Sequence, residues 1–125
     1  MKRILQTQNA PKPVGPYSQA VKAGKFLFLS GQIAVDPKEG KIIYSDIKNQ
    51  TRQVLDNINA ILDGAGCALE DVVQTNVYLS SMTLFSEFNS EYSEYFRVDF
   101  PARVTVEAKL PLGALVEISV IAYKE

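Results

Sequence analysis

Apolar residues recur at every second position in the second half of the chain, which is the pattern of β-strands. Residues 72–79 predict one strand, and residues 104–110 and 115–123 predict two more that close the chain as a hairpin. In the last of these strands both faces are largely apolar. Such a strand is expected to be covered on both sides.

The first half of the chain contains a second hairpin signal. Residues 17–22 and 25–30 flank Ala23-Gly24, a pair typical of a tight turn between antiparallel strands. The turn-forming residues 36–40 then separate this hairpin from a helical segment.

A first helix is predicted by apolar residues at helical spacing between positions 47 and 65. Ser45 offers an N-cap, and Asp46 suits the first turn because the helix dipole favours an anion there. Either Gly64 or Gly66 can end the helix in a left-handed conformation. Its polar face is expected to be solvated and comprises Lys48, Gln50, Arg52, Gln53, Asn57 and Asn59.

A second helix is predicted after Thr83, which can act as its N-cap. Asn89 shares a face with the apolar stripe of this helix, because it is four residues from the first aromatic residue and three from the third. That stripe consists of Phe85, Phe88, Tyr92, Tyr95 and Phe96.

The order of these elements predicts one α+β domain over residues 1–125, with two helices packed on one face of a mixed β-sheet. Two helices cover only one face of such a sheet, whereas its last strand is apolar on both. The second face is therefore expected to be buried in a homo-oligomer.

The chain contains no histidine and a single cysteine, Cys67. Acid-base chemistry must then fall to a carboxylate, a tyrosine, a lysine or a bound water. Histidine-ligated and cysteine-ligated zinc sites are excluded, and we expect neither a metal nor a cofactor. Cys67 is expected to be a small packing residue.

The charges are balanced, with 13 basic and 14 acidic residues and a net charge of −1. General affinity for nucleic acid is not expected, because it requires a concentrated cationic face. No stretch is long and apolar enough to span a bilayer, and no signal peptide is recognisable. With its one unpaired cysteine, the chain is expected to be a soluble cytoplasmic protein.

Two charged residues stand on predicted strands near the C-terminus. The planar fork of Arg103 suits a carboxylate or phosphate, although a strand-end ion pair is the commoner role for such an arginine. Glu117 lies among apolar residues and is either a general acid or base, or a carboxylate facing solvent on an edge strand. Whether the two share a face depends on the register of the last hairpin.

Other candidate residues carry weaker signals. Asn89 either positions a substrate or subunit contact, or satisfies a local hydrogen bond in the core. Ser30-Gly31 ends a strand, and a glycine there lets a ligand approach the backbone N–H groups closely. Tyr17 follows Gly15-Pro16, which is ordinary turn chemistry.

Taken together, these segments resemble the reactive-intermediate deaminase family, also called Rid or YjgF. The resemblance spans nearly the whole chain and rests on five motifs in order: Gly15-Pro16-Tyr17-Ser18-Gln19-Ala20, Ser30-Gly31-Gln32-Ile33, Asn89, Pro101-Ala102-Arg103, and Leu110-Pro111 through Val116-Glu117-Ile118.

The resemblance implies a chorismate-mutase-like α+β fold, assembled as a homotrimer with a cleft between each pair of neighbouring subunits. It also implies cofactor-independent hydrolysis of short-lived enamines and imines, such as 2-aminoacrylate, 2-iminopropanoate and 2-iminobutanoate. The products would be a 2-keto acid and ammonia.

By the same resemblance, Arg103 would bind the substrate carboxylate and Glu117 would orient or deprotonate the attacking water. The residues expected to line the cleft are Tyr17, Ser30, Gly31, Asn89 and Thr105. Two positions depart from the family pattern. Thr105 replaces a small residue or cysteine, which is expected to change the substrate range, and Ser119 replaces the second acidic residue of Glu-Ile-Glu.

Two other functions are considered for the same fold. One is a regulator that senses a 2-keto acid in the clefts, or a chaperone, and the other is a ribonuclease or translation inhibitor. Retention of Glu117 beside Arg103 favours the enzyme, since a sensor needs only the arginine. The neutral charge and the lack of histidine argue against the nuclease.

Overall fold

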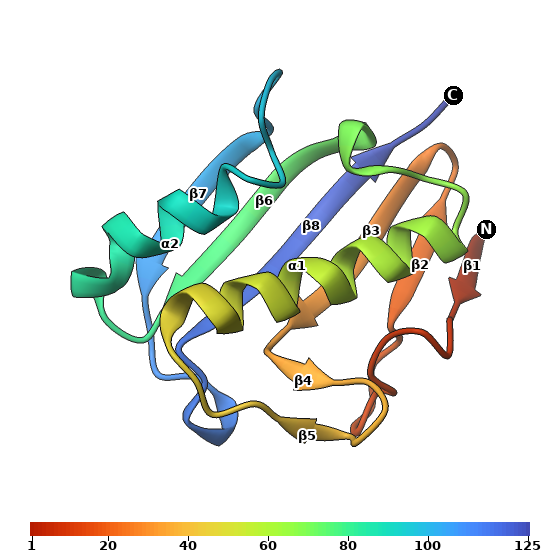
Figure 1. Cartoon of the computed structure of the whole chain (residues 1–125). Helices are drawn as coiled ribbons and strands as arrows, with labels where there is room; N and C mark the ends of the chain where they lie inside the picture. Colours follow the sequence, from red (N-terminus) through yellow and green to blue (C-terminus); the bar gives the residue numbers. More distant parts are fainter.

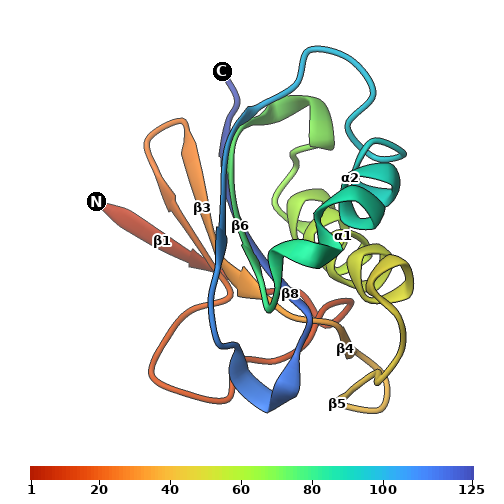
Figure 2. The same cartoon turned by 90° about the vertical axis from the view of Figure 1, so that its left-hand side faces the viewer.

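A six-stranded mixed sheet with two helices on one of its faces forms the body of the protein (Figures 1 and 2). The computed structural model describes residues 1–125. The strand order in the sheet is β1-β2-β3-β8-β6-β7. The strands are β1 (Lys2–Leu5), β2 (Ala20–Ala23), β3 (Phe26–Gln32), β6 (Val72–Leu79), β7 (Ala102–Glu107) and β8 (Val116–Tyr123). The predicted α+β class with two helices on one face is confirmed.

The remaining elements are short apart from the two α-helices. A two-stranded ribbon precedes the first helix, and three single-turn 3₁₀ helices lie at connections. These elements are β4 (Val35–Asp36), β5 (Lys41–Ile42), α1 (Ile47–Gly64), η1 (Leu69–Asp71), η2 (Met82–Leu84), α2 (Phe85–Tyr92) and η3 (Pro111–Gly113). Neither α-helix is long and apolar enough to cross a bilayer.

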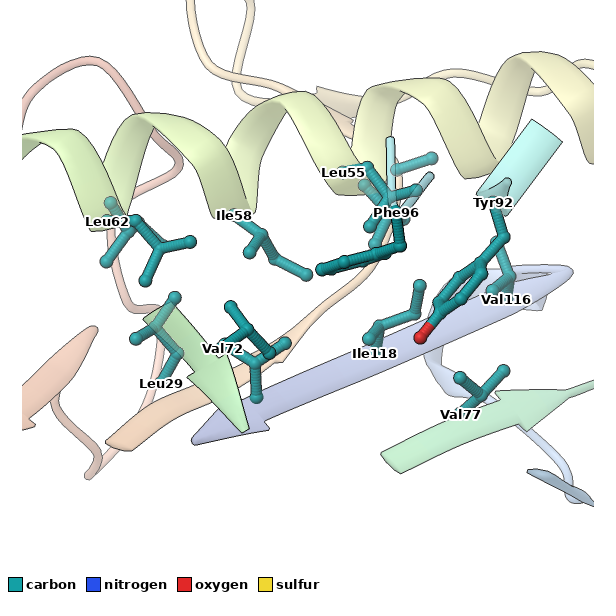
Figure 3. Close-up of a cluster of buried hydrophobic side chains, with 14 of the residues drawn as sticks. Leu29, Leu55, Ile58, Leu62, Val72, Val77, Tyr92, Phe96, Val116 and Ile118 are labelled. Carbon is teal, nitrogen blue, oxygen red and sulfur yellow. The ribbon is translucent and has the colours of Figure 1, made fainter. Parts of the chain in front are cut away.

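The core lies between the sheet and the two helices (Figure 3). From α1, Leu55, Ile58 and Leu62 point down onto the sheet, where Val116 and Ile118 of β8 meet them (Figure 3). All five side chains are fully buried. Each contributes roughly 1.5–3 kcal/mol relative to an exposed position, so this layer fixes β8 beneath the helices.

The first helix begins one residue later than predicted. Its N-cap is Asp46, whose carboxylate accepts a hydrogen bond of 2.8 Å from the backbone N–H of Asn49. The Ser45 hydroxyl instead accepts from the Asn49 side chain at 3.0 Å. At the other end Gly66, with a φ of 77°, takes the left-handed conformation, whereas Gly64 is still helical.

The prediction that the polar face of α1 is solvated is wrong for two amides. Gln50 and Asn57 are each only 1% exposed. Gln50 donates to the Ile43 carbonyl and accepts from the Leu115 N–H, both at 2.9 Å. Asn57 donates to the Val35 carbonyl at 2.9 Å. These amides tie the ribbon and the segment before β8 to the helix, and their hydrogen bonds offset the cost of burial.

The second helix is preceded by a 3₁₀ turn, so the predicted cap is displaced. The Ser81 hydroxyl accepts from the Thr83 N–H at 3.2 Å, and α2 itself begins at Phe85. The predicted aromatic stripe is buried at Phe88, Tyr92 and Phe96, whose successive ring centroids are 5.4 and 4.8 Å apart.

The predicted hairpin between the last two strands is wrong. β7 pairs with β6 in parallel, and β8 pairs with the opposite edge of β6 in antiparallel orientation. Helix α2 lies in the connection that two parallel strands require. The segment from 108 to 115 then carries the chain past β6 to β8. The last two strands are therefore separated by β6 and share no register.

The N-terminal hairpin forms with a shifted turn and a further strand. Ala23 pairs with Phe26, so the two turn residues are Gly24 and Lys25, and Gly24 has a φ of 62°. β1 pairs with β2 at the edge of the sheet and was not predicted, because it is short and carries charged residues.

No element of the chain covers the second face of the sheet (Figure 2). Alternate residues of β8 on the helix side are buried, whereas those on the other side are half-buried. Apolar side chains are exposed on this open face, with Phe26 and Phe28 at 43% and 42% exposure and Val104 and Val106 at 53% and 41%. The open face is thus apolar over several strands, as the sequence indicated.

Candidate functional site

Arg103 lies on β7 with its side chain on the helix side of the sheet. It is paired with Thr75 of β6, whose side chain is fully buried under α2. The guanidinium carbon lies 4.9 Å from the ring centroid of Tyr92, 5.5 Å from that of Phe85 and 5.7 Å from that of Phe88. Three aromatic rings of α2 therefore hold this cation at the outer edge of the sheet.

The Arg103 guanidinium has no counter-ion in the chain. The only ion pair joins Arg52 and Glu91, whose Nε and Oε2 atoms are 3.3 Å apart. Aromatic faces attract a cation but do not neutralise it, so a half-buried arginine in this position favours the arrival of an anion. The bidentate fork suits a carboxylate.

The ring beneath Arg103 is itself fixed by a buried hydrogen bond. The Tyr92 hydroxyl lies 2.9 Å from the Thr75 hydroxyl. Burial raises the pKa of the Tyr92 phenol, while the bond to Thr75 and the charge of Arg103 act against that rise. The phenol stays neutral near neutral pH, so it contributes an aromatic face and no charge.

Glu117 lies on the opposite face of the sheet from Arg103. It is paired with Tyr78 of β6, and both side chains project from the open face. Because Arg103 shares the helix side with Thr75, the sheet itself separates the arginine from the carboxylate. One chain cannot bring the two groups to the same small substrate.

The Glu117 carboxylate rests over the backbone of Gly31 on β3. A Cβ atom at position 31 would collide with Oε2 of Glu117 and lie 3.0 Å from its Cδ. The register of β3 against β8 is irregular between Leu29 and Gln32, so Gly31 lies in a bulge. The glycine is needed for space, since its φ is not positive.

Burial raises the pKa of the Glu117 carboxyl above that of an ordinary glutamate. No nearby charge contributes to the shift, and the carboxylate makes no hydrogen bond within the chain. A carboxylate whose pKa is raised in this way is a stronger base once ionised, which suits proton transfer near neutral pH.

An open depression of about 420 Å³ lies around Glu117. Five of its seven lining residues were not among the predicted site residues, and two of these five, Tyr78 and Lys109, carry titratable side chains. Tyr78 carried a signal, since it alternates with the buried positions of β6, whereas Lys109 carried none. The lining consists of Gly31, Tyr78, Ala108, Lys109, Leu110, Glu117 and Ser119.

The other predicted site residues divide between these two places. Thr105 is paired with Val77 on the helix side, two residues along β7 from Arg103. Asn89 lies on α2, and its Oδ1 is buried without a hydrogen-bond partner. Thr105 therefore lies on the same face of β7 as Arg103, and Asn89 lies on the helix whose rings contact Arg103.

Tyr17 and Ser30 belong instead with the loop beside Gly31. The Ser30 hydroxyl donates to the Ser18 carbonyl at 2.5 Å, which joins the loop to β3. The buried side chain of Gln19 donates to the carbonyls of Thr7 and Pro11 at 3.2 and 3.0 Å. Tyr17 projects from this anchored loop and is 48% exposed.

No group of three or more cysteine, aspartate or glutamate side chains gathers closely enough to hold a metal ion. The polar side chains described at the two places are Arg103, Thr105 and Asn89 on one side, and Glu117, Tyr78, Lys109 and Ser119 on the other.

Comparison with protein families and curated proteins gives strong matches over almost the full length. Residues 7–124 match the family model described as Endoribonuclease L-PSP. A RutC family protein of Pyrococcus horikoshii is 58% identical over 126 residues and is matched over 100% of both chains. The 2-iminobutanoate/2-iminopropanoate deaminase of Homo sapiens is 38% identical over 123 residues, which cover 98% of this chain and 90% of the human protein.

Solved structures match equally well. A conserved Rid family protein of Yersinia pestis has a TM-score of 0.96 and 45% identity, with coverage of 99% of this chain and 100% of that chain. Escherichia coli TdcF with bound serine has a TM-score of 0.93 and 35% identity, with coverage of 98% and 99%.

Proposed function

Since the chain belongs to the endoribonuclease L-PSP family, which includes Rid and RutC proteins, we propose that it hydrolyses 2-imino acids and their enamine tautomers to 2-keto acids and ammonia. The human and goat relatives named 2-iminobutanoate/2-iminopropanoate deaminase support this reaction at 38% and 41% identity. The family resemblance seen in the sequence is thereby confirmed, and the particular reaction is our proposal.

The observation that carries the proposal is the guanidinium of Arg103, which has no counter-ion in the chain and lies against three aromatic rings of α2. In the proposed complex its two N–H edges bind both oxygens of the substrate carboxylate. The serine bound to E. coli TdcF, a relative of 35% identity, also carries a carboxylate. Recognition through the carboxylate would leave the C=N carbon free to meet water.

Glu117 supplies the base in this mechanism. Its carboxylate takes a proton from a water molecule, and the water oxygen bonds to the C=N carbon. An imine carbon is already electrophilic, so the main tasks of the protein are to position the reactants and to accept that proton. No cofactor is needed for these steps.

We further propose that the working site forms between subunits of a homotrimer. Arg103 and Thr105 lie on the helix side of the edge strand β7, and Asn89 lies on α2. Glu117 lies on the opposite face of the sheet, so the two halves must come from different chains. The exposed apolar surface of the open face supports this assembly, because contact with another copy would bury it. Each neighbouring pair would then form one cleft.

The proposal is tested by supplying 2-aminoacrylate from a pyridoxal-phosphate serine dehydratase and following the formation of pyruvate. The purified protein should accelerate the decay of this intermediate in proportion to its concentration. Decay at the rate of the buffer control would contradict the proposed reaction.

A second candidate function is a sensor that binds 2-keto acids in the same cleft without turnover. The bound serine of TdcF is the observation that favours it. Calorimetric titration with pyruvate or 2-oxobutanoate in the absence of any catalysed decay would select this alternative. For a ribonuclease we find no support in the site, which offers neither a histidine nor a cluster of cations.

A further inference from the structure

Four residues on strands line the depression around Glu117. Among them, Tyr78 is the only one besides Glu117 whose side chain carries an acidic proton. It lies directly across from Glu117 in the pairing of β6 and β8, and both residues line the depression. Paired residues on one face of a sheet have Cβ atoms about 4.5–5.5 Å apart, so the two side chains start from neighbouring points and border one volume, the depression.

The two groups approach that volume from different sides. The Glu117 carboxylate leans over Gly31 of β3, which is the neighbour of β8 on the side away from β6. Tyr78 comes from β6 itself. The hydroxyl groups of Tyr44, Tyr92 and Tyr95 are engaged in hydrogen bonds within the chain, whereas that of Tyr78 is not.

Imine hydrolysis requires an acid as well as a base. When water adds to the C=N carbon, the π electron pair moves to nitrogen, which must take up a proton. The water must lose one at the same time. With no histidine in the chain, one residue cannot easily serve both tasks near neutral pH.

We propose that the Tyr78 hydroxyl is this acid and donates its proton to the imine nitrogen while Glu117 accepts the proton of the attacking water. This inference rests on the proposed deaminase function and adds a catalytic residue to it. The phenol O–H supplies the proton that the imine nitrogen must take up.

The second half of the reaction restores both groups. Glu117 passes its new proton to the nitrogen of the carbinolamine, and the phenolate of Tyr78 takes the proton of the carbinolamine hydroxyl. The C–N bond breaks with its electron pair on nitrogen, so ammonia leaves and the C=O bond forms. Lys109, whose side chain lines the same depression, stabilises the phenolate through its positive charge.

The test is Tyr78→Phe, with Tyr123→Phe as the matched control. Tyr123 also projects from the open face, but it lies at the far end of β8, where its ring packs 5.0 Å from that of Phe26. With 2-aminoacrylate supplied by the dehydratase, Tyr78→Phe should lower kcat on the order of 100-fold, the range of general acid catalysis, and leave KM within about twofold. Tyr123→Phe should behave as the wild type.

The pH dependence separates an acid from a structural residue. At lower pH the solvent protonates more of the imine, so the deficit of Tyr78→Phe should shrink as the pH falls. A pH-independent deficit, or a deficit shared equally by Tyr123→Phe, would overturn the assignment. An active wild type with an equally active Tyr78→Phe would overturn it while leaving the deaminase function intact, and an inactive wild type would overturn both.

Discussion

The carboxylate of Glu117 occupies the space that a side chain at position 31 would fill. The contact joins β8 to the bulge of β3, so the direction of the carboxylate depends on a residue that has no side chain. Within this site Gly31 therefore positions Glu117, in addition to any contact between its backbone and a ligand.

Gly31→Ala should reduce turnover sharply, because the new methyl group displaces the carboxylate from its place over β3. We expect kcat to fall at least tenfold in the deaminase assay. The fold should persist, since the backbone at Gly31 is accessible to alanine. The double variant Gly31→Ala/Glu117→Gln should be no slower than Glu117→Gln alone, and additive losses would show that Gly31 acts independently of the carboxylate.

Glu117→Gln keeps the shape of the side chain but cannot accept a proton. Turnover should fall on the order of 100-fold or more, while binding of a 2-keto acid measured by calorimetry should persist. In the wild type the acid limb of the kcat profile should lie above the pH at which an ordinary glutamate titrates, because burial raises the pKa of Glu117. An acid limb at the pH where an ordinary glutamate titrates would mean that Glu117 is not the catalytic base.

Glu117→Gln should also change the thermal stability of the protein in a way that depends on pH. The folded state binds the Glu117 proton more tightly than the unfolded state, so the resulting stabilisation is present below the ordinary pKa of about 4.3 and is lost as the pH rises through the raised value. Glutamine mimics the protonated form at every pH. Glu117→Gln should therefore raise Tm at pH 7, and the difference should disappear toward pH 4.

Local patterns in the sequence predicted the elements of this fold and the faces of its strands. The alternation of apolar residues in the last segment correctly predicted strand β8, and the aromatic spacing correctly described the buried face of α2. These predictions succeeded because each depends only on the spacing of apolar residues within one segment.

Features that depend on pairing between distant segments were not predictable in the same way. Nothing in β7 or β8 indicates that β6 lies between them, yet this placement puts Arg103 and Glu117 on opposite faces. Likewise, Gln50 is of a residue type that is usually exposed to solvent. It is buried because the segment before β8 returns to α1. The separation of Arg103 from Glu117 by the sheet therefore emerged only from the structure.

The open face of the sheet supplies a prediction about assembly. Light scattering at micromolar concentration should report three chains for the wild type. Phe28→Asp places a charge in the middle of this face, where burial against another copy would be costly, and should produce monomers. These monomers should be inactive although Arg103 and Glu117 are unchanged.

Phe28→Leu is the control, since it keeps an apolar side chain at the same position. It should remain trimeric and active. If Phe28→Asp were monomeric and fully active, one chain would suffice for catalysis and the site between subunits would be wrong.

Arg103 should recognise the carboxylate of the substrate through both the charge and the shape of its guanidinium. Arg103→Lys keeps the charge but loses the bidentate fork, and Arg103→Ala loses both. Activity on 2-iminopropanoate should fall in that order, with a loss of about 2 kcal/mol, or about 30-fold in kcat/KM, for alanine.

Comparison with a neutral imine of similar size shows whether Arg103 acts on the substrate carboxylate. A residue that reads the carboxylate has nothing to bind on the neutral imine, so its removal should affect that substrate little. Equal losses on both substrates would instead mean that Arg103 supports the packing of α2 through the rings of Phe85, Phe88 and Tyr92.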